Sequence, residues 1–178
     1  VVIHADTSNF TYNFDVDWDD DGVFDSLGIT KTVIHTYGDT GTYTIRIRGQ
    51  FPYFLSRSTG VFQNLKIISI DQWGTTAWES LNSSYAGCEL LQINASDLPN
   101  MSLGPNCQTA FLDVPNAIKP LENLDVSKVK IMSDMFGVSF VTPTKLVVNL
   151  NGWDTDSVEG MSYMFSGRLD SIICDAWD

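Results

Sequence analysis

The second half of the chain repeats one phrase, and this repetition constrains the fold more than any other feature of the sequence. The segments 73–87, 124–137 and 153–167 align without a gap. A weaker copy occupies residues 99–111, and a further copy opens at 177–178. Equivalent positions are Leu81, Cys107, Met132 and Met161, which lie 26, 25 and 29 residues apart. A period of this size is typical of chains that stack one structural unit on the next.

Each copy has the pattern of a short helix. Thr76, Ser127 and Asp156 carry side-chain oxygens of the kind that accept a hydrogen bond from the free N–H groups at a helix start. Apolar residues follow at i, i+3 and i+7, which is one face of a helix. They are Trp78, Leu81 and Tyr85, then Val129, Met132 and Phe136, then Val158, Met161 and Phe165. We expect helices that start within two residues of the capping positions and end near Gly87, Gly137 and Gly167, where a left-handed residue is favoured.

Short aliphatic runs precede the helical patterns and predict strands. They lie at residues 67–70, 90–93, 146–150 and 172–174, and the stretch 118–121 is the poorest because it contains Pro120. Stacked strand–turn–helix units place a parallel sheet on one side and a row of helices on the other. The residues expected to form the repeat interior are Trp73, Leu81, Tyr85, Met132, Phe136, Trp153, Met161 and Phe165.

The phrase Trp-Asp-x-x-x-Val-x-x-Met-Ser-x-Met-Phe, found at residues 153–165, resembles the repeat of BspA-like leucine-rich-repeat surface proteins of bacteria. The resemblance covers roughly residues 65–178. It implies a leucine-rich-repeat-like α/β solenoid with short helices. It also implies a non-enzymatic protein that is exposed on the bacterial surface.

Residues 1–62 read differently, because short alternating runs are separated by turn-rich stretches. This pattern indicates a small sandwich of antiparallel sheets. The residues Asp15-Val-Asp-Trp-Asp with Gly22, and His35 to Thr44, resemble a PKD-type immunoglobulin-like domain. The apolar residues Phe51, Tyr53, Phe54 and Phe62 are expected to pack between this part and the repeats.

The predicted fold class is therefore α+β with two domains. A small PKD-like β-sandwich over residues 1–62 precedes a leucine-rich-repeat-like α/β solenoid with short helices over residues 63–178. The chain begins without a signal sequence and ends as a copy opens, so we expect it to be a piece of a longer protein. We also expect weak self-association through the edge of the strand at 172–174, because an unpaired strand edge is a template for another chain.

Charge and composition exclude several partners. The net charge is −12 and the pI is near 4.3, which argues against nucleic acid and against docking on anionic lipid. The sequence has no apolar run of about 18 residues, so membrane insertion is not expected. Cys88, Cys107 and Cys174 lack zinc spacing and read as small core residues, although a bridge between Cys88 and Cys107 is an open alternative.

The densest group of polar residues is an acidic stretch in the first domain. Asp17, Asp19 and Asp21, followed by Gly22, match the first half of a calcium loop, in which oxygens recur at every second residue. The twelfth position, where an EF-hand needs a glutamate, is Gly28. The alternative is an ordinary turn whose carboxylates are solvated or bond to backbone N–H groups. Calcium is therefore a candidate ligand, and no other cofactor is expected.

No residue pattern indicates catalysis. Asp125 and Asp154 recur in equivalent positions, and a residue repeated in every unit serves the unit. Trp73, Trp153 and Trp177 also share a column, which is either a sugar-binding platform or a packed ladder. The sequence predicts an extracellular adhesion or interaction module that binds a protein on a host or neighbouring cell. The alternatives are an architectural spacer and a carbohydrate-binding module.

Overall fold

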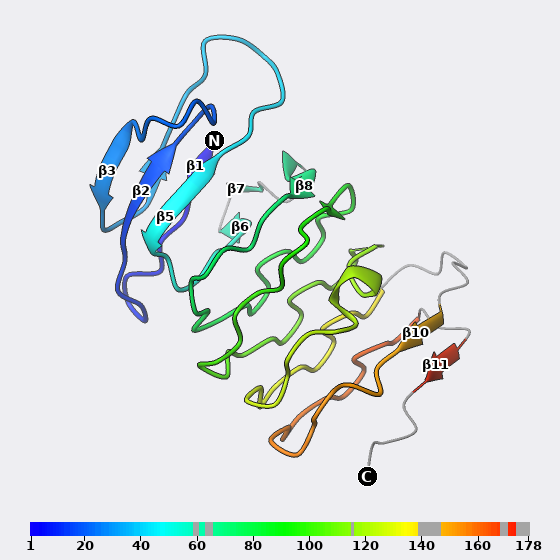
Figure 1. Ribbon diagram of the computed structural model, residues 1–178. Coiled ribbons are helices and arrows are strands. Elements are labelled where there is room, and N and C mark those ends of the chain that lie inside the picture. The colour runs from blue at the N-terminus through cyan, green and yellow to red at the C-terminus, as the bar shows by residue number, and fades with distance from the viewer. Residues whose placement is uncertain (59–60, 63–65, 115, 139–146, 168–170, 174–178) are drawn as a thin grey trace.

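The computed structural model describes residues 1–58, 61–62, 66–114, 116–138, 147–167 and 171–173 of the 178-residue chain. A small antiparallel β-structure forms the N-terminal end, and a row of stacked coils extends from it towards the C-terminus (Figure 1). A coil here means one turn of the repeated backbone path.

The N-terminal β-structure contains two antiparallel sheets. Strand β2 (Asn13–Asp17) lies at the centre of a three-stranded sheet between β3 (Ser26–Ile29) and β5 (Arg46–Gln50), while β1 (Val2–Ile3) pairs with β4 (Val33–Ile34). The side chains of Phe14 and Val16 on β2 are buried, as the period of two in a strand requires. This arrangement fits the predicted small β domain.

The segment that follows β5 belongs to both parts of the molecule. Phe51 and Tyr53 are buried, and Phe54 packs against the same core. The ring of Phe51 contacts Phe14 on one side and Trp78 on the other, with centroids 4.9 and 6.4 Å apart. The expected packing between the two parts is confirmed for these three residues, while the side chain of Phe62 lies outside the described ones. A short hairpin of β6 (Arg57–Ser58) and β7 (Val61–Phe62) comes next.

The predicted helices do not form, and the predicted fold class of an α/β solenoid with short helices is wrong. Across the residues that the structure describes there is no α-helix, and the 3-10 turn η2 (Lys119–Leu121) is only three residues long. The segments expected to be helical, such as 82–87 and 162–167, are consecutive turns. The described part of the chain is almost entirely strands, isolated bridges and turns, and it forms an open stack rather than a closed solenoid.

One backbone angle in each coil explains why a helix cannot form. Ser83, Thr109, Asp134 and Tyr163 occupy equivalent positions and have φ between 52° and 57°. An α-helix needs negative φ throughout, and a left-handed residue ends it. The N–H of the residue after each one bonds to the carbonyl three positions earlier, as Ser84 does to Leu81 at 3.0 Å. A positive φ at the third position is what a turn of type II requires.

Alternate backbone N–H groups bond to the next coil instead of their own. The N–H groups of Leu81, Ser83, Tyr85 and Gly87 donate to the carbonyls of Asn106, Gln108, Ala110 and Leu112 at 2.8–3.0 Å. The same pattern joins residues 107–113 to 131–137 and residues 132–138 to 160–166. We call this set of bonds the coil ladder. The repeat spacing seen in the sequence is thus the number of residues that separates equivalent positions in two hydrogen-bonded coils.

The predicted strands form on a second side of the coils. Strand β8 (Ser69–Ile70) pairs in parallel with β9 (Gln92–Ile93), and β10 (Val147–Asn149) pairs in parallel with β11 (Ser171–Ile173). Between the pairs lies η2, where Pro120 removes a backbone donor. The expected continuous parallel sheet is therefore divided into two pairs. Self-association through the edge of β11 stays a prediction.

Aromatic rings at equivalent positions stack through the interior. The rings of Tyr85, Phe111, Phe136 and Phe165 follow one another with centroids 5.4, 5.7 and 6.2 Å apart and planes within 8° of parallel. Met132 and Phe136 are buried as predicted, whereas Met161 and Phe165 are only partly buried. Trp73 and Trp153 lie against this stack and are buried too.

Substitutions at Asp134 distinguish a left-handed turn from a helix. In the turn, glycine accepts φ of 53° without strain, so Asp134→Gly should be more stable than Asp134→Ala by about 1 kcal/mol. In a helix the order reverses, because glycine is about 1 kcal/mol worse than alanine there. Urea unfolding of both variants measures the order, and alanine as the more stable residue would contradict the coil.

The aromatic stack predicts a graded cost of truncation. Phe136 is 1% exposed and has rings on both sides, so Phe136→Ala should lower the free energy of unfolding by about 3–5 kcal/mol. Leu103, which is 59% exposed, provides a control whose change to alanine should alter it by about 0.5 kcal/mol or less. Equal losses for both variants in urea unfolding would exclude the stack as the core.

Candidate functional site

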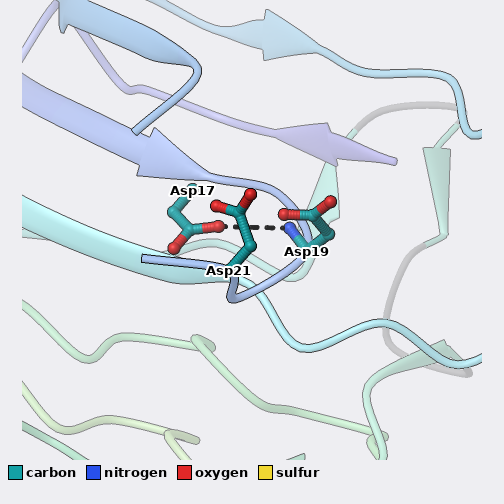
Figure 2. A group of neighbouring side chains, drawn as sticks. All are labelled: Asp17, Asp19 and Asp21. Atoms are coloured by element: carbon teal, nitrogen blue, oxygen red, sulfur yellow. Dashed lines mark hydrogen bonds between the residues drawn. The ribbon is translucent and has the colours of Figure 1, made fainter. Parts of the chain in front are cut away.

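The acidic turn that follows β2 brings the three predicted calcium ligands together. Figure 2 shows Asp17, Asp19 and Asp21 side by side where the chain leaves the strand. One carboxylate oxygen from each residue lies within 4.8 Å of the other two. Asp17 is fully buried, while Asp19 and Asp21 are exposed.

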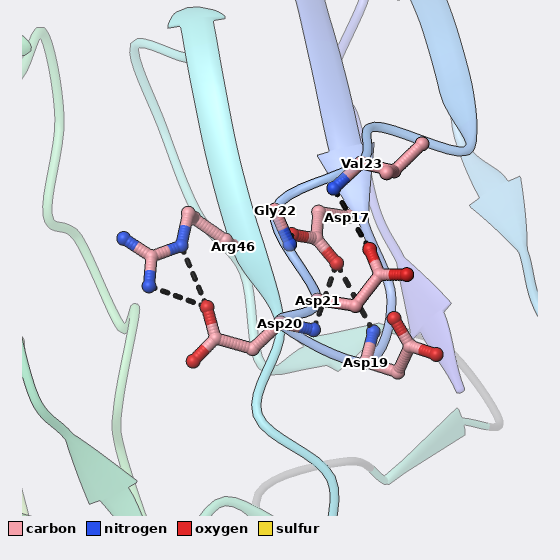
Figure 3. A network of polar contacts seen from close by, with 7 residues as sticks. All are labelled: Asp17, Asp19, Asp20, Asp21, Gly22, Val23 and Arg46. Atoms are coloured by element: carbon pink, nitrogen blue, oxygen red, sulfur yellow. Dashed lines mark hydrogen bonds and ion pairs between the residues drawn. The ribbon is translucent and has the colours of Figure 1, made fainter.

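The buried carboxylate of Asp17 organises this turn. Its Oδ1 accepts hydrogen bonds from the N–H groups of Asp19 at 3.3 Å and Asp20 at 2.7 Å, and its Oδ2 accepts one from Gly22 at 3.0 Å (Figure 3). Burial alone would raise the pKa of the Asp17 carboxyl, but these backbone donors together hold the pKa below its usual value. The ionised form of Asp17 is therefore the one that the turn stabilises.

Two arginines on β5 attach the acidic stretch to the sheet. Arg46 forms an ion pair with Asp20, which has φ of 62°, and the two lie beside the turn in Figure 3. Arg48 donates to Asp15 at 2.9 Å, and its guanidinium lies over the ring of Phe24. A hydrogen bond from the N–H of Gly28, and then the bond from Arg48, lower the pKa of Asp15. Positive side chains thus offset part of the negative charge here.

The chemistry of the turn supports two roles. The turn role is visible in the bonds that Asp17 accepts, and Asp21 caps the N–H of Val23 at 2.8 Å. Calcium takes six to eight oxygen ligands, so Asp17, Asp19 and Asp21 would have to be joined by backbone oxygens or water. Calcium binding therefore stays a prediction, with Asp19 as the carboxylate most available to an ion.

The repeat residues predicted from the sequence lie in the core and not at a surface site. Trp73 and Trp153 are 6% and 3% exposed, so they pack in the core and do not form an exposed sugar-binding platform. The indole N–H of Trp153 donates to the carbonyl of Glu122 at 2.9 Å. Trp177 lies outside the described residues. The sequence interpretation missed Asp97, whose carboxylate accepts bonds from the N–H groups of Trp73 and Gly74 at 3.0 and 2.8 Å.

The coils display a regular row of polar side chains that the sequence interpretation did not identify. The row consists of Asn82, Gln108, Ser133 and Ser162, each followed by the left-handed residue of its coil. Where two left-handed residues meet, the hydroxyl groups of Ser83 and Thr109 bond at 2.8 Å. We call these eight positions the turn row. The sequence carries a signal of this row, because a polar residue directly follows the equivalent apolar residue of each copy, namely Leu81, Cys107, Met132 and Met161.

Cys88 and Cys107 serve as small core residues. Cys88 and Cys107 are buried and free, so the alternative of a bridge between them is excluded. Burial raises the pKa of Cys88 to about 11 and that of Cys107 to about 12, which keeps both as unreactive thiols. Cys174 lies outside the described residues.

The fold and the candidate site define a class of protein: a small β domain that continues into a stack of turn-based repeats. Residues 105–171, less than half of the chain, match a family described as "Mycoplasma protein of unknown function, DUF285". This family is found in BspA-like surface repeat proteins. No curated protein and no solved structure matches the chain. Within the described ranges, no helix is long and apolar enough to cross a membrane.

Calcium binding is tested by thermal unfolding. If the acidic turn binds the ion, millimolar calcium should raise the melting temperature, because a ligand that binds only the folded state stabilises it. Excess chelator should remove the gain, and Asp19→Asn should abolish it. Magnesium at the same concentration controls for ionic strength. An unchanged melting temperature in calcium and in chelator would contradict calcium binding and would leave the formation of the turn as the only role of these carboxylates.

Proposed function

We propose that this protein is a non-enzymatic bacterial surface protein whose repeats bind a protein partner on a host or neighbouring cell. The match of residues 105–171 to a family found in BspA-like surface repeat proteins supports this assignment. The proposal includes an extracellular location and a PKD-like character for the N-terminal β domain, whose two antiparallel sheets are consistent with it.

The turn row is the observation that carries the proposal. The coil ladder fixes the backbone of each coil against the next, so the row's side chains are held at regular intervals. Gln108, Ser162 and Tyr163 are exposed, and Tyr163 is 75% exposed. Side chains that are rigidly spaced but free to differ from coil to coil are what extended repeat surfaces use for recognition. Exposed tyrosine adds contact area at low entropy cost.

Two alternatives are weaker. A carbohydrate-binding module would use exposed tryptophans, but Trp18, Trp73, Trp78 and Trp153 are all buried. An architectural spacer needs a stable stack and no binding surface. The binding module requires the turn row to contact a partner protein, whereas the spacer does not. A binding measurement therefore separates the two.

Adhesion of coated beads tests the proposal. Beads that carry the 178-residue chain should bind cultured epithelial cells above albumin-coated beads, and trypsin treatment of the cells should remove the binding. The triple variant Gln108→Ala, Ser133→Ala and Ser162→Ala should reduce the affinity by about tenfold, the equivalent of about 1.4 kcal/mol.

The control is a triple alanine variant at exposed threonines of the β domain, namely Thr30, Thr36 and Thr44. It should bind as the unchanged chain does, and both variants should retain their melting temperature. Adhesion that the turn-row variant leaves intact would place the binding surface elsewhere. No adhesion above albumin would favour the spacer for this cell type and would contradict the proposal.

A further inference from the structure

A hollow in the N-terminal β domain lies apart from the turn row. Its volume is about 310 Å³, near the lower end of the range for ligand pockets. It is formed by the turn between β2 and β3, the start of β3 and the loop between β4 and β5. The residues that line it are Trp18, Asp19, Asp25, Ser26, His35, Tyr37, Gly38, Asp39 and Tyr43.

Four aromatic rings form a continuous wall of this hollow. Trp18 stacks on His35, with centroids 4.5 Å apart, and Tyr37 stacks on Tyr43. His35 joins the two pairs by meeting Tyr37 edge to face at 4.5 Å. Trp18 is buried and Tyr43 is the most exposed of the four, so the wall extends from the core to the surface.

The polar atoms of these rings are already bonded to the protein. The indole N–H of Trp18 donates to Ser26 at 2.9 Å, and the hydroxyl of Tyr37 donates to the carbonyl of Trp18 at 2.5 Å. The hydroxyl of Tyr43 donates to the carbonyl of Asp39 at 3.0 Å. Trp18 is 3% exposed and backs the wall, so Tyr37 and Tyr43 are the rings that offer a ligand carbon surface and π electrons rather than a hydrogen bond.

Carboxylates supply the polar part of the lining. Asp19, Asp25 and Asp39 are exposed at the hollow, and neither lysine nor arginine is among its lining residues. Asp25 accepts the N–H of Trp18 at 3.0 Å with one of its oxygens. Burial, and then the nearby Tyr43, Asp19 and Asp25, raise the pKa of Tyr37.

We propose that this hollow binds an organic cation with an apolar stem, such as the ammonium end of a lysine side chain. The aromatic wall would bury the stem and attract the positive charge through the ring faces. The carboxylates of Asp19 and Asp39 would neutralise the charge, and the net charge of −12 would favour encounter with a cation.

The same reasoning separates this site from the calcium candidate. Asp19 belongs to both the acidic turn and the hollow. A calcium ion takes oxygen ligands and gains nothing from a row of aromatic rings. An organic cation would use both the aromatic rings and the carboxylates. Binding of an organic cation should therefore depend on Tyr43, whereas binding of calcium should not.

Titration of the 178-residue chain by NMR in the presence of chelator tests the proposal. The probe is Nα-acetyl-lysine methylamide, and its uncharged match is Nα-acetyl-norleucine methylamide. The backbone N–H of Gly38 and the indole N–H of Trp18 should shift with the lysine probe. The norleucine probe should bind at least about tenfold more weakly, a difference of about 1.4 kcal/mol. Equal binding of the two probes would overturn the proposal.

Two variants test the two walls separately. Asp19→Asn combined with Asp39→Asn should weaken the lysine probe by about tenfold. The control pair Glu89→Gln and Asp156→Asn removes the same charge at exposed positions outside the hollow and should leave the affinity unchanged. Tyr43→Ala should also weaken binding, provided that its melting temperature shows a folded chain. If it is unfolded, the charge pair decides. Unchanged affinity in the pair Asp19→Asn and Asp39→Asn would refute the site.

The source of the cation is distinguished by two further probes. A tetralysine peptide that binds more tightly than tetramethylammonium would identify a basic protein segment as the ligand. Tetramethylammonium that binds as tightly as the peptide would identify a free small cation. If neither perturbs Gly38 and Trp18 at millimolar concentration, the hollow is not a cation site.

Discussion

The structure depends on the alternating use of backbone N–H groups in each coil. One N–H donates within its own turn, and the next donates to the following coil, as Ser84 and Tyr85 do. A backbone in which every buried N–H is paired is a requirement for any interior, and here two kinds of partner meet it in turn. The left-handed residue of each coil makes this alternation possible, because it closes the turn and redirects the chain. Strands, core and surface row all follow from the spacing that the ladder imposes.

The aromatic stack is the side-chain counterpart of the ladder. Coils joined by backbone bonds place equivalent residues above one another, so a large ring at one position must be matched in the next coil. Phe111 completes the stack between Tyr85 and Phe136, although its coil has the weakest sequence match. At the N-terminal end, Phe51 continues the aromatic packing into the β domain, and the hydroxyl of Tyr12 donates to the carbonyl of Tyr53 at 3.1 Å. The β domain therefore closes this end of the stack.

The sequence predicted the repeat, the strands and the buried columns, but it could not predict the local conformation. Leu81, Ser84, Tyr85 and Cys88 are all buried, and this i, i+3, i+4, i+7 pattern is the signature of a helix. Two successive turns bury the same positions, so periodicity does not separate the two structures. Glycine would have revealed the left-handed position, but none of the four coils has it there. Ser83, Thr109 and Tyr163 are of types that are uncommon in that region, and Asp134 alone is of a type that is enriched in it. The ladder, which is a non-local interaction, decides in favour of turns.

The candidate sites show the same division between local and non-local information. The grouping of Asp17, Asp19 and Asp21 is local, and its spacing was visible in the sequence. The aromatic hollow joins Trp18 to His35 and Tyr43, which are brought together only when β2 and the loop after β4 pack against each other.

The ladder also gives each coil a direction. The face towards the following coil presents N–H donors, as residues 132–138 do, and the face towards the preceding coil presents carbonyl acceptors. The carbonyls of Leu81, Ser83 and Tyr85 are used inside their own coil, so the donor face has no acceptor to offer there. Two donor faces cannot pair with each other. A donor face can therefore pair only with a face that presents carbonyls, as residues 132–138 pair with residues 160–166.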